Sequence, residues 1–120
     1  MDNESGFKII DYKKSDGAPA SSGDTVTVHY KVALNMDQLE QGPWIDNSWD
    51  RYPVQFVLGT GEALKGVDIG LEGMRNASTR RLIIPASLAF GHRGVSGLVP
   101  PDTTLYFEVY LTNIKKQDSV

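Results

Sequence analysis

The side chains best able to do chemistry in this sequence are apolar and aromatic residues beside a few polar ones. They are Tyr30, Trp44, Ile45, Asp46, Trp49, Asp50, Arg51, Phe90, Leu98, Val99 and Phe107. The usual catalytic patterns are missing: there is no cysteine, the two histidines lie far apart, and no serine stands in a Gly-x-Ser-x-Gly motif. No His, Asp or Glu cluster has metal-ligand spacing, so neither a metal nor another cofactor is expected. What remains is the chemistry of an apolar cavity.

Two of these residues, Leu98 and Val99, lie on a loop that the sequence marks clearly. Glycines at 91, 94 and 97 allow turn conformations closed to other residues, and the Pro pair at 100–101 excludes helix. The strand that follows is the clearest in the chain, because apolar residues alternate along 105–111. Apolar side chains on such a loop either tuck beneath it or line a site, and the sequence leaves this choice open.

The other elements that must position these residues are mostly strands. Alternation predicts further strands at 7–12, 25–34, 54–58 and 80–84. Residues 59–73 are the helix candidate, since apolar residues at i, i+3 and i+7 share one face, although two glycines weaken it. The polar segment 35–43 is expected to leave the sheet before residues 44–46 rejoin it. These elements predict an α+β fold in which an antiparallel sheet wraps around one helix.

The overall composition is that of an ordinary soluble globular protein. The chain has 120 residues, 40% of them apolar and 22% charged, with a net charge of −3. This length favours a single domain over 1–120, with a core at about 5–115 and polar tails. Basic residues are too few and scattered for a nucleic-acid partner, and no apolar run approaches a membrane span or a signal sequence. A cytoplasmic monomer is therefore the default expectation.

Seven short motifs occur in an order that resembles one known family. They are Val-His-Tyr at 28–30, Asp-x-Ser-x-Asp-Arg at 46–51, Pro-x-x-Phe-x-Leu-Gly at 53–59, Lys-Gly at 65–66, Gly-Met at 73–74, Ile-Pro-x-x-Leu-Ala-Phe-Gly at 84–91 and Gly-Leu-Val-Pro-Pro-x-Thr-Thr-Leu at 97–105. Together they resemble the FKBP family of peptidyl-prolyl cis-trans isomerases (rotamases, immunophilins) over residues 5 to 115. The resemblance implies a five- or six-stranded antiparallel β-sheet curled around one short α-helix, and a role in protein folding.

The resemblance also implies a pocket between helix and sheet that binds proline-containing peptides or proteins, or a macrolide. Its catalytic residues are expected at Tyr30, Asp46, Phe90 and Phe107. Its substrate-binding residues are expected at Ile45, Arg51, Val54, Phe56, Glu62, Ala63, Leu64, Val67, Val95, Leu98 and Val99. By the same analogy, the backbone around residues 62–64 meets ligand carbonyls.

Such a pocket needs no acid, base or nucleophile. Rotation about an X-Pro bond requires the loss of amide resonance, at a barrier of about 20 kcal/mol. An apolar cavity favours the twisted, less dipolar transition state relative to the planar amide. Asp46, held by Tyr30 and Arg51, is expected to face the substrate carbonyl carbon or a ligand hydroxyl. The alternative is a surface turn network of Asp46, Asp50 and Arg51 with structural value only.

Several positions depart from the family pattern by the loss of aromatic or polar groups. Val67 stands where the family usually has the Trp of the pocket floor, and Ile45 and Val54 also replace aromatic residues. Phe90 lacks the hydroxyl of the usual Tyr, which removes a hydrogen bond worth roughly 0.5–1.5 kcal/mol. These changes predict weak macrolide binding and reduced isomerase activity. Segment 35–44 looks several residues longer than in the family, as a partner-recognition element or a tolerated insertion.

Three functions stay open at this point. The first is a prolyl isomerase acting on exposed X-Pro segments. The second is a catalytically weak module that binds a prolyl peptide or a partner. The third is a chaperone-like domain, for which the sequence lacks a large exposed apolar insert. Trp44 and Trp49, both additions to the family pattern, either restore aromatic surface at the pocket rim or pack a loop, and for Trp44 packing is favoured.

Overall fold

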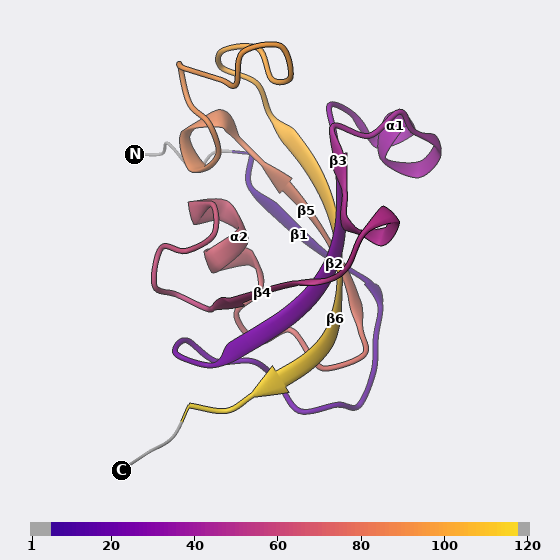
Figure 1. Cartoon of the computed structure of the whole chain (residues 1–120), viewed down its shortest axis with the longest axis vertical. Coiled ribbons are helices and arrows are strands. Elements are labelled where there is room, and N and C mark those ends of the chain that lie inside the picture. Colours follow the sequence, from indigo (N-terminus) through magenta and orange to yellow (C-terminus); the bar gives the residue numbers. More distant parts are fainter. Residues whose placement is uncertain (1–5, 118–120) are drawn as a thin grey trace.

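The fold is an antiparallel β-sheet that curls around a short helix (Figure 1). The computed structural model describes residues 6–117, so the expected polar tails lie mostly outside the described residues. The strands are β1 (Lys8–Lys13), β2 (Thr25–Ala33), β3 (Asp46–Asn47), β4 (Val54–Val57), β5 (Thr79–Ile84) and β6 (Leu105–Lys115). Their order is β1-β5-β6-β2-β3, and β4 pairs with β2. The predicted α+β fold class with an antiparallel sheet is confirmed.

The two central strands, β2 and β6, are the ones with the clearest alternation in the sequence. Val26, Val28 and Val32 of β2 are at most 5% exposed, and Leu105 and Val109 of β6 are 1% exposed. Successive side chains of a strand point to opposite faces, so these residues form the apolar inner face that covers the core. Because β2 pairs with β6 along nearly its whole length, the two strands form one continuous wall.

The helix predicted within 59–73 forms only over α2 (Lys65–Gly70), and it packs on the inner face of β5. Its two glycines permit this close packing. A Cβ atom added at Gly66 would lie 2.4 Å from Cγ2 of Ile84, and one added at Gly70 would lie 2.7 Å from Cδ1 of Leu82. The residues that weaken the helix intrinsically are therefore the ones that let it approach the sheet.

A second helix, α1 (Met36–Gln41), lies in the segment predicted to be an irregular polar excursion, so the expectation of a single α-helix is wrong. The side chain of Asn35 caps it by accepting a hydrogen bond from the backbone N–H of Gln38 at 2.8 Å. Leu39 anchors it and is fully buried. A helix of 6 residues is too short to display a helical period, so pattern reasoning could not find it.

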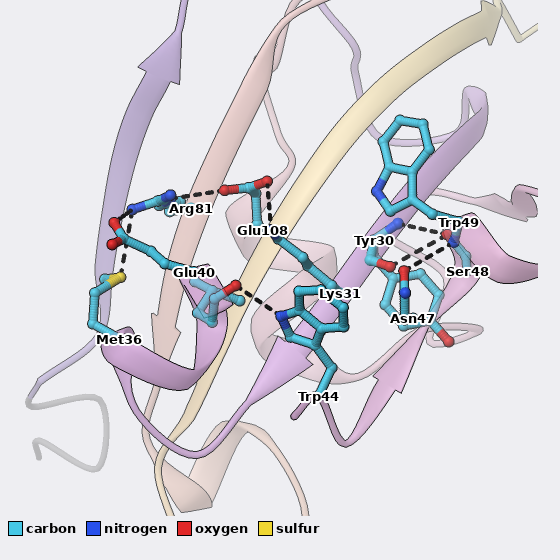
Figure 2. A network of polar contacts seen from close by, with 11 residues as sticks. Tyr30, Lys31, Met36, Glu40, Trp44, Asn47, Ser48, Trp49, Arg81 and Glu108 are labelled. Atoms are coloured by element: carbon cyan, nitrogen blue, oxygen red, sulfur yellow. Dashed lines mark hydrogen bonds and ion pairs between the residues drawn. The ribbon is translucent and has the colours of Figure 1, made fainter. Parts of the chain in front are cut away.

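Charged side chains fasten α1 to the outer face of the sheet (Figure 2). Arg81 of β5 is only 8% exposed, and its guanidinium donates to Glu108 of β6 at 2.9 Å and to Glu40 of α1 at 3.0 Å. Lys31 of β2 approaches the same Glu108 at 3.7 Å. Lys31, Glu108 and Arg81 are paired in register across three adjacent strands, so strand alternation places all three on one face.

Candidate functional site

A cavity of about 680 Å³ opens between the inner face of the sheet, α2 and the connection from β5 to β6. Every predicted site residue except Arg51 lines it. The lining residues are Val28, Tyr30, Val32, Ile45, Asp46, Val54, Gln55, Phe56, Glu62, Ala63, Leu64, Val67, Phe90, Val95, Leu98, Val99, Leu105, Phe107 and Val109. The structure thus brings the predicted residues together, while their individual roles in binding and catalysis stay predictions.

The cavity wall also contains residues that were not predicted as site residues: Val28, Val32, Gln55, Leu105 and Val109. A signal for four of them was present in the sequence. Two valines of β2 alternate in phase with Tyr30, and two residues of β6 alternate in phase with Phe107, so each pair shares a face with a predicted site residue. Gln55 lies on β4, where the sequence offers no comparable signal.

The turn before α2 forms one side of the cavity mouth, and side-chain carboxylates hold its backbone. Asp68 of α2 accepts hydrogen bonds from the backbone N–H groups of Gly59 and Gly61, both at 2.9 Å. Glu62 accepts from the backbone N–H of Val57 at 3.1 Å. These bonds fix residues 59–62 between β4 and α2 and so place residues 62–64 along the cavity wall.

The opposite side of the mouth is the connection from β5 to β6, which contains the 3-10 helix η2 (Ala86–Leu88). Val95 and Val99 bond each other's backbone N–H and C=O groups, both at 2.8 Å, and so close a tight loop. Val99 is 5% exposed at its base and Leu98 is 57% exposed at its tip. Both line the cavity, which answers the question that the sequence left open about them.

The polar group at the cavity edge consists of Tyr30, Asp46 and Arg51. The Tyr30 hydroxyl donates to Oδ2 of Asp46. Oδ1 of Asp46 accepts from Arg51 at 3.1 Å and from the backbone N–H of Asn47 at 2.8 Å. Arg51 therefore acts on the cavity through Asp46 rather than as a lining residue, while Asp50 is exposed on the neighbouring 3-10 helix η1 (Ser48–Asp50).

These contacts fix the charge state of the polar group. Burial favours the neutral acid of Asp46, but the hydrogen bonds from Tyr30, Asn47 and Arg51 outweigh burial and hold its pKa below the ordinary value. Burial, followed by the bond to Asp46, raises the pKa of Tyr30 to about 12. At neutral pH the cavity edge therefore presents a carboxylate whose oxygens are already hydrogen-bonded, beside a neutral phenol.

Neither additional tryptophan lines the cavity. The indole N–H of Trp44 donates to the backbone C=O of Leu39 in α1 at 2.8 Å, and the Lys31 ammonium lies 5.0 Å from the centre of its ring (Figure 2). Trp49 stacks on the imidazole of His29, with ring centres 4.0 Å apart. Trp44 thus packs its own segment, as favoured from the sequence, and Trp49 packs on the outer face.

Two negative findings apply to residues 6–117. No group of three or more His, Cys, Asp or Glu residues is arranged to hold a metal ion within that range. None of the helices described there is long and apolar enough to cross a membrane.

Comparison with known proteins identifies the family. Residues 17–112 match the family model of FKBP-type peptidyl-prolyl cis-trans isomerases. The chain belongs to this FKBP family. The FKBP relative "Peptidyl-prolyl cis-trans isomerase FPR2" of Saccharomyces cerevisiae is 45% identical over 97 residues, which cover 80% of this chain and 69% of the yeast protein. An FK506-binding protein of Neisseria meningitidis serogroup A is 39% identical over 107 residues, or 88% of this chain and 94% of the bacterial one.

A structural FKBP neighbour agrees with this assignment. The crystal structure of AtFKBP13 superposes with a TM-score of 0.79 at 32% identity and covers 93% of this chain and 94% of that one. The resemblance inferred from the seven motifs is therefore confirmed, and so is the enzyme class, FKBP-type peptidyl-prolyl isomerase. The alternative of a catalytically weak binding module is not favoured by these relatives.

Proposed function

We propose that this isomerase takes the prolyl ring of an X-Pro segment of a peptide or protein into the cavity and lowers the barrier to rotation there. The observation that carries the proposal is an apolar cavity whose ionised lining groups, Asp46 and Glu62, both have hydrogen-bond partners within the protein. Such a site can accept an apolar ring without leaving a buried charge unpaired.

The proposed mechanism follows from the polarity of the cavity. The planar X-Pro amide owes its rotation barrier of about 20 kcal/mol to resonance, which also makes it strongly dipolar. Phe107 and Val99, both buried, and Phe90 at the mouth replace water around the bond. The twisted transition state loses less by this desolvation than the planar amide does, so the barrier falls.

Asp46 adds an electrostatic contribution in this proposal. Tyr30 and Arg51 keep it ionised and orient it at the cavity edge, where it faces the carbonyl carbon of the residue before proline. Phe90, which carries no hydroxyl, contributes shape only. The cavity offers a macrolide no aromatic floor, because Val67 is at that position, and no hydroxyl donor at Phe90. Macrolide binding is therefore expected to be weak.

Three further properties belong to the same proposal. The chain is expected to act as a single domain with a core at about 5–115, as a monomer, and in the cytoplasm. Its substrates are expected to be folding proteins with exposed X-Pro segments. These properties rest on composition and on the family resemblance.

The direct test is NMR exchange spectroscopy on a series of X-Pro peptides with catalytic amounts of protein. The wild type is expected to accelerate exchange, and the Phe107→Ala variant to lose at least about tenfold in catalysed rate, because a ring 7% exposed on the cavity wall is removed. Phe107→Leu retains most of the volume, so it controls for the roughly 3–5 kcal/mol of stability that Phe107→Ala can cost. Peptide binding without any acceleration by the wild type would contradict the proposal.

A further inference from the structure

The edge of β2 that faces β3 and β4 has a gap at Tyr30. Strand β4 pairs with β2 over residues 25–28, and β3 pairs with it at residues 31–32. Val32 uses its C=O on this edge to bond the N–H of Ile45 at 2.7 Å. Backbone groups of a strand point to the same side at every second residue, so the N–H and C=O of Tyr30 face the same edge without a strand to bond them.

Ser48 of η1 fills this gap with its side chain. Its Oγ accepts from the backbone N–H of Tyr30 at 2.7 Å and donates to the backbone C=O of Tyr30 at 3.3 Å (Figure 2). Ser48 is completely buried, although it lies between half-buried Asn47 and exposed Trp49. One hydroxyl therefore replaces the strand partner that the backbone of Tyr30 lacks.

The same hydroxyl also contacts His29, whose side chain lies on the outer face of the sheet. Nδ1 of His29 lies 2.9 Å from Oγ of Ser48, and the imidazole is stacked under Trp49. A serine hydroxyl offers one proton and two lone pairs. All three contacts are satisfied when Nδ1 of His29 donates, the N–H of Tyr30 donates, and Ser48 donates to the C=O of Tyr30. Only this one assignment of donors and acceptors satisfies all three contacts of the Ser48 hydroxyl, so the orientation of the hydroxyl is tightly restrained.

The position of Ser48 in the chain connects this contact to the cavity. It lies two residues after Asp46, on the same short segment, and Tyr30 contacts both residues: its hydroxyl bonds the Asp46 carboxylate and its backbone bonds Ser48. Two contacts of one residue with one segment fix both the distance and the orientation of that segment. Loss of the Ser48 contact would remove the anchor that follows Asp46 in the chain, and would leave the short pairing of β3 with residues 31–32 and the side-chain bonds from Tyr30 and Arg51 to hold Asp46 at the cavity edge.

We propose that Ser48 is a positioning residue of the isomerase: it docks the segment that carries Asp46 onto the backbone of Tyr30 and thereby sets the geometry of the Tyr30–Asp46 pair. The inference rests on the function proposed above, in which that pair faces the substrate. Ser48 itself does not line the cavity. Its effect on catalysis must therefore pass through Tyr30 and Asp46.

The test is a double-mutant cycle on catalysed X-Pro exchange. Ser48→Ala is expected to lower the catalysed rate about three- to tenfold in the wild-type background, and to have an effect of less than about twofold in a Tyr30→Phe background, where the hydroxyl that holds Asp46 is already gone. Equal losses in both backgrounds would overturn the proposal, because they would mean that Ser48 acts independently of the Tyr30 hydroxyl.

Two variants separate positioning from general destabilisation. Ser48→Thr keeps the hydroxyl and is expected to retain most of the wild-type rate. Ser78→Ala removes another buried serine, 7% exposed, whose hydroxyl bonds the backbone C=O of Arg75 at 2.6 Å away from the cavity. It is expected to lower the unfolding midpoint without changing the rate measured at a temperature well below that midpoint.

A second measurement does not depend on catalysis. The carboxyl carbon of Asp46, followed by NMR during a pH titration, reports its pKa, which Ser48→Ala is expected to raise toward the ordinary value. An unchanged pKa together with an unchanged exchange rate overturns the inference. If the wild type accelerates no peptide but the pKa of Asp46 still rises in Ser48→Ala, the proposed function fails while the positioning role of Ser48 stands.

Discussion

The two faces of the sheet carry different side chains, although residues of the two faces are neighbours in sequence on the same three strands. On the inner face, Val32, Phe107 and Leu82 are paired across β2, β6 and β5 and are at most 7% exposed. One residue away on each strand, Lys31, Glu108 and Arg81 form the charged row of the outer face. Alternation thus gives the same strands an apolar cavity wall on one side and a network of ion pairs on the other.

The two faces also differ in how their space is filled. The outer row is covered by α1, so its charges are partly buried and mutually paired. The inner wall is covered by α2 and the loops only around its edges, which leaves the cavity open. We therefore expect substitutions on the outer face to change stability and those on the cavity rim to change activity. Two experiments test this distinction, and a third tests a contact between β2 and β6 that both faces share; the largest expected effect comes first.

Arg81→Met should destabilise the fold by about 3 kcal/mol while leaving catalysed exchange nearly unchanged. It leaves Glu108, whose side chain is 18% exposed, without its main partner. Chemical denaturation measures the stability, and Arg93→Met on an exposed loop position is the matched control. Adding Glu108→Leu to Arg81→Met should recover most of the loss. A strong loss of activity at full stability would instead mean that the two faces are coupled.

Acid should destabilise the fold by protonating Asp24, which holds together two strands that contribute to both faces. This carboxylate is 2% exposed and joins the start of β2 to the end of β6. Hydrogen bonds from the Lys116 ammonium and from the backbone N–H groups of Gln117 and Ser21 lower its pKa to about 2. Because the unfolded chain takes up this proton first as the pH falls, the stabilisation is present above pH 4 and is lost as the pH approaches 2.

The acid-dependent part of the unfolding free energy assigned to Asp24 is about 2 kcal/mol. Denaturation curves at pH 7 and pH 3 should therefore differ less for Asp24→Asn than for the wild type. Asp50→Asn, at an exposed position of η1, serves as the control and should keep the wild-type difference. An unchanged pH dependence in Asp24→Asn would show that other carboxylates carry the acid sensitivity.

Leu98→Ala should have the smallest effect on stability, below about 0.5 kcal/mol, because the side chain is 57% exposed. Its methyl groups line the cavity rim, so catalysed exchange should fall about fivefold, the equivalent of about 1 kcal/mol of lost apolar contact with the substrate. Ile69→Ala is the matched control, since Ile69 is 41% exposed on α2 outside the cavity lining. Equal effects of the two variants would exclude a rim role for Leu98.

Much of the cavity could be predicted from the chain because it is built from regular strands. The alternation in β2 and β6 placed Tyr30 and Phe107 on the inner face, and the motif order located Asp46, Phe90 and Val99. Helix α1 was not predicted, because the sequence carries no such signal for it. It is short, and its stability comes from the Asn35 cap, buried Leu39 and contacts with the outer face rather than from a helical repeat of apolar residues. Arg51 holds Asp46, as expected from the sequence, but it does not line the cavity as the family resemblance implied.

The sequence by itself determined which residues alternate, where glycine and proline interrupt them, and to which family the motifs point. Only the tertiary structure decided which partners those residues meet. The buried hydroxyl of Ser48 bonds Tyr30 across 18 positions of sequence, and Arg81 reaches Glu40 across 41. Local pattern carries no information about such contacts, because they form only when the fold brings together segments that are distant in the chain.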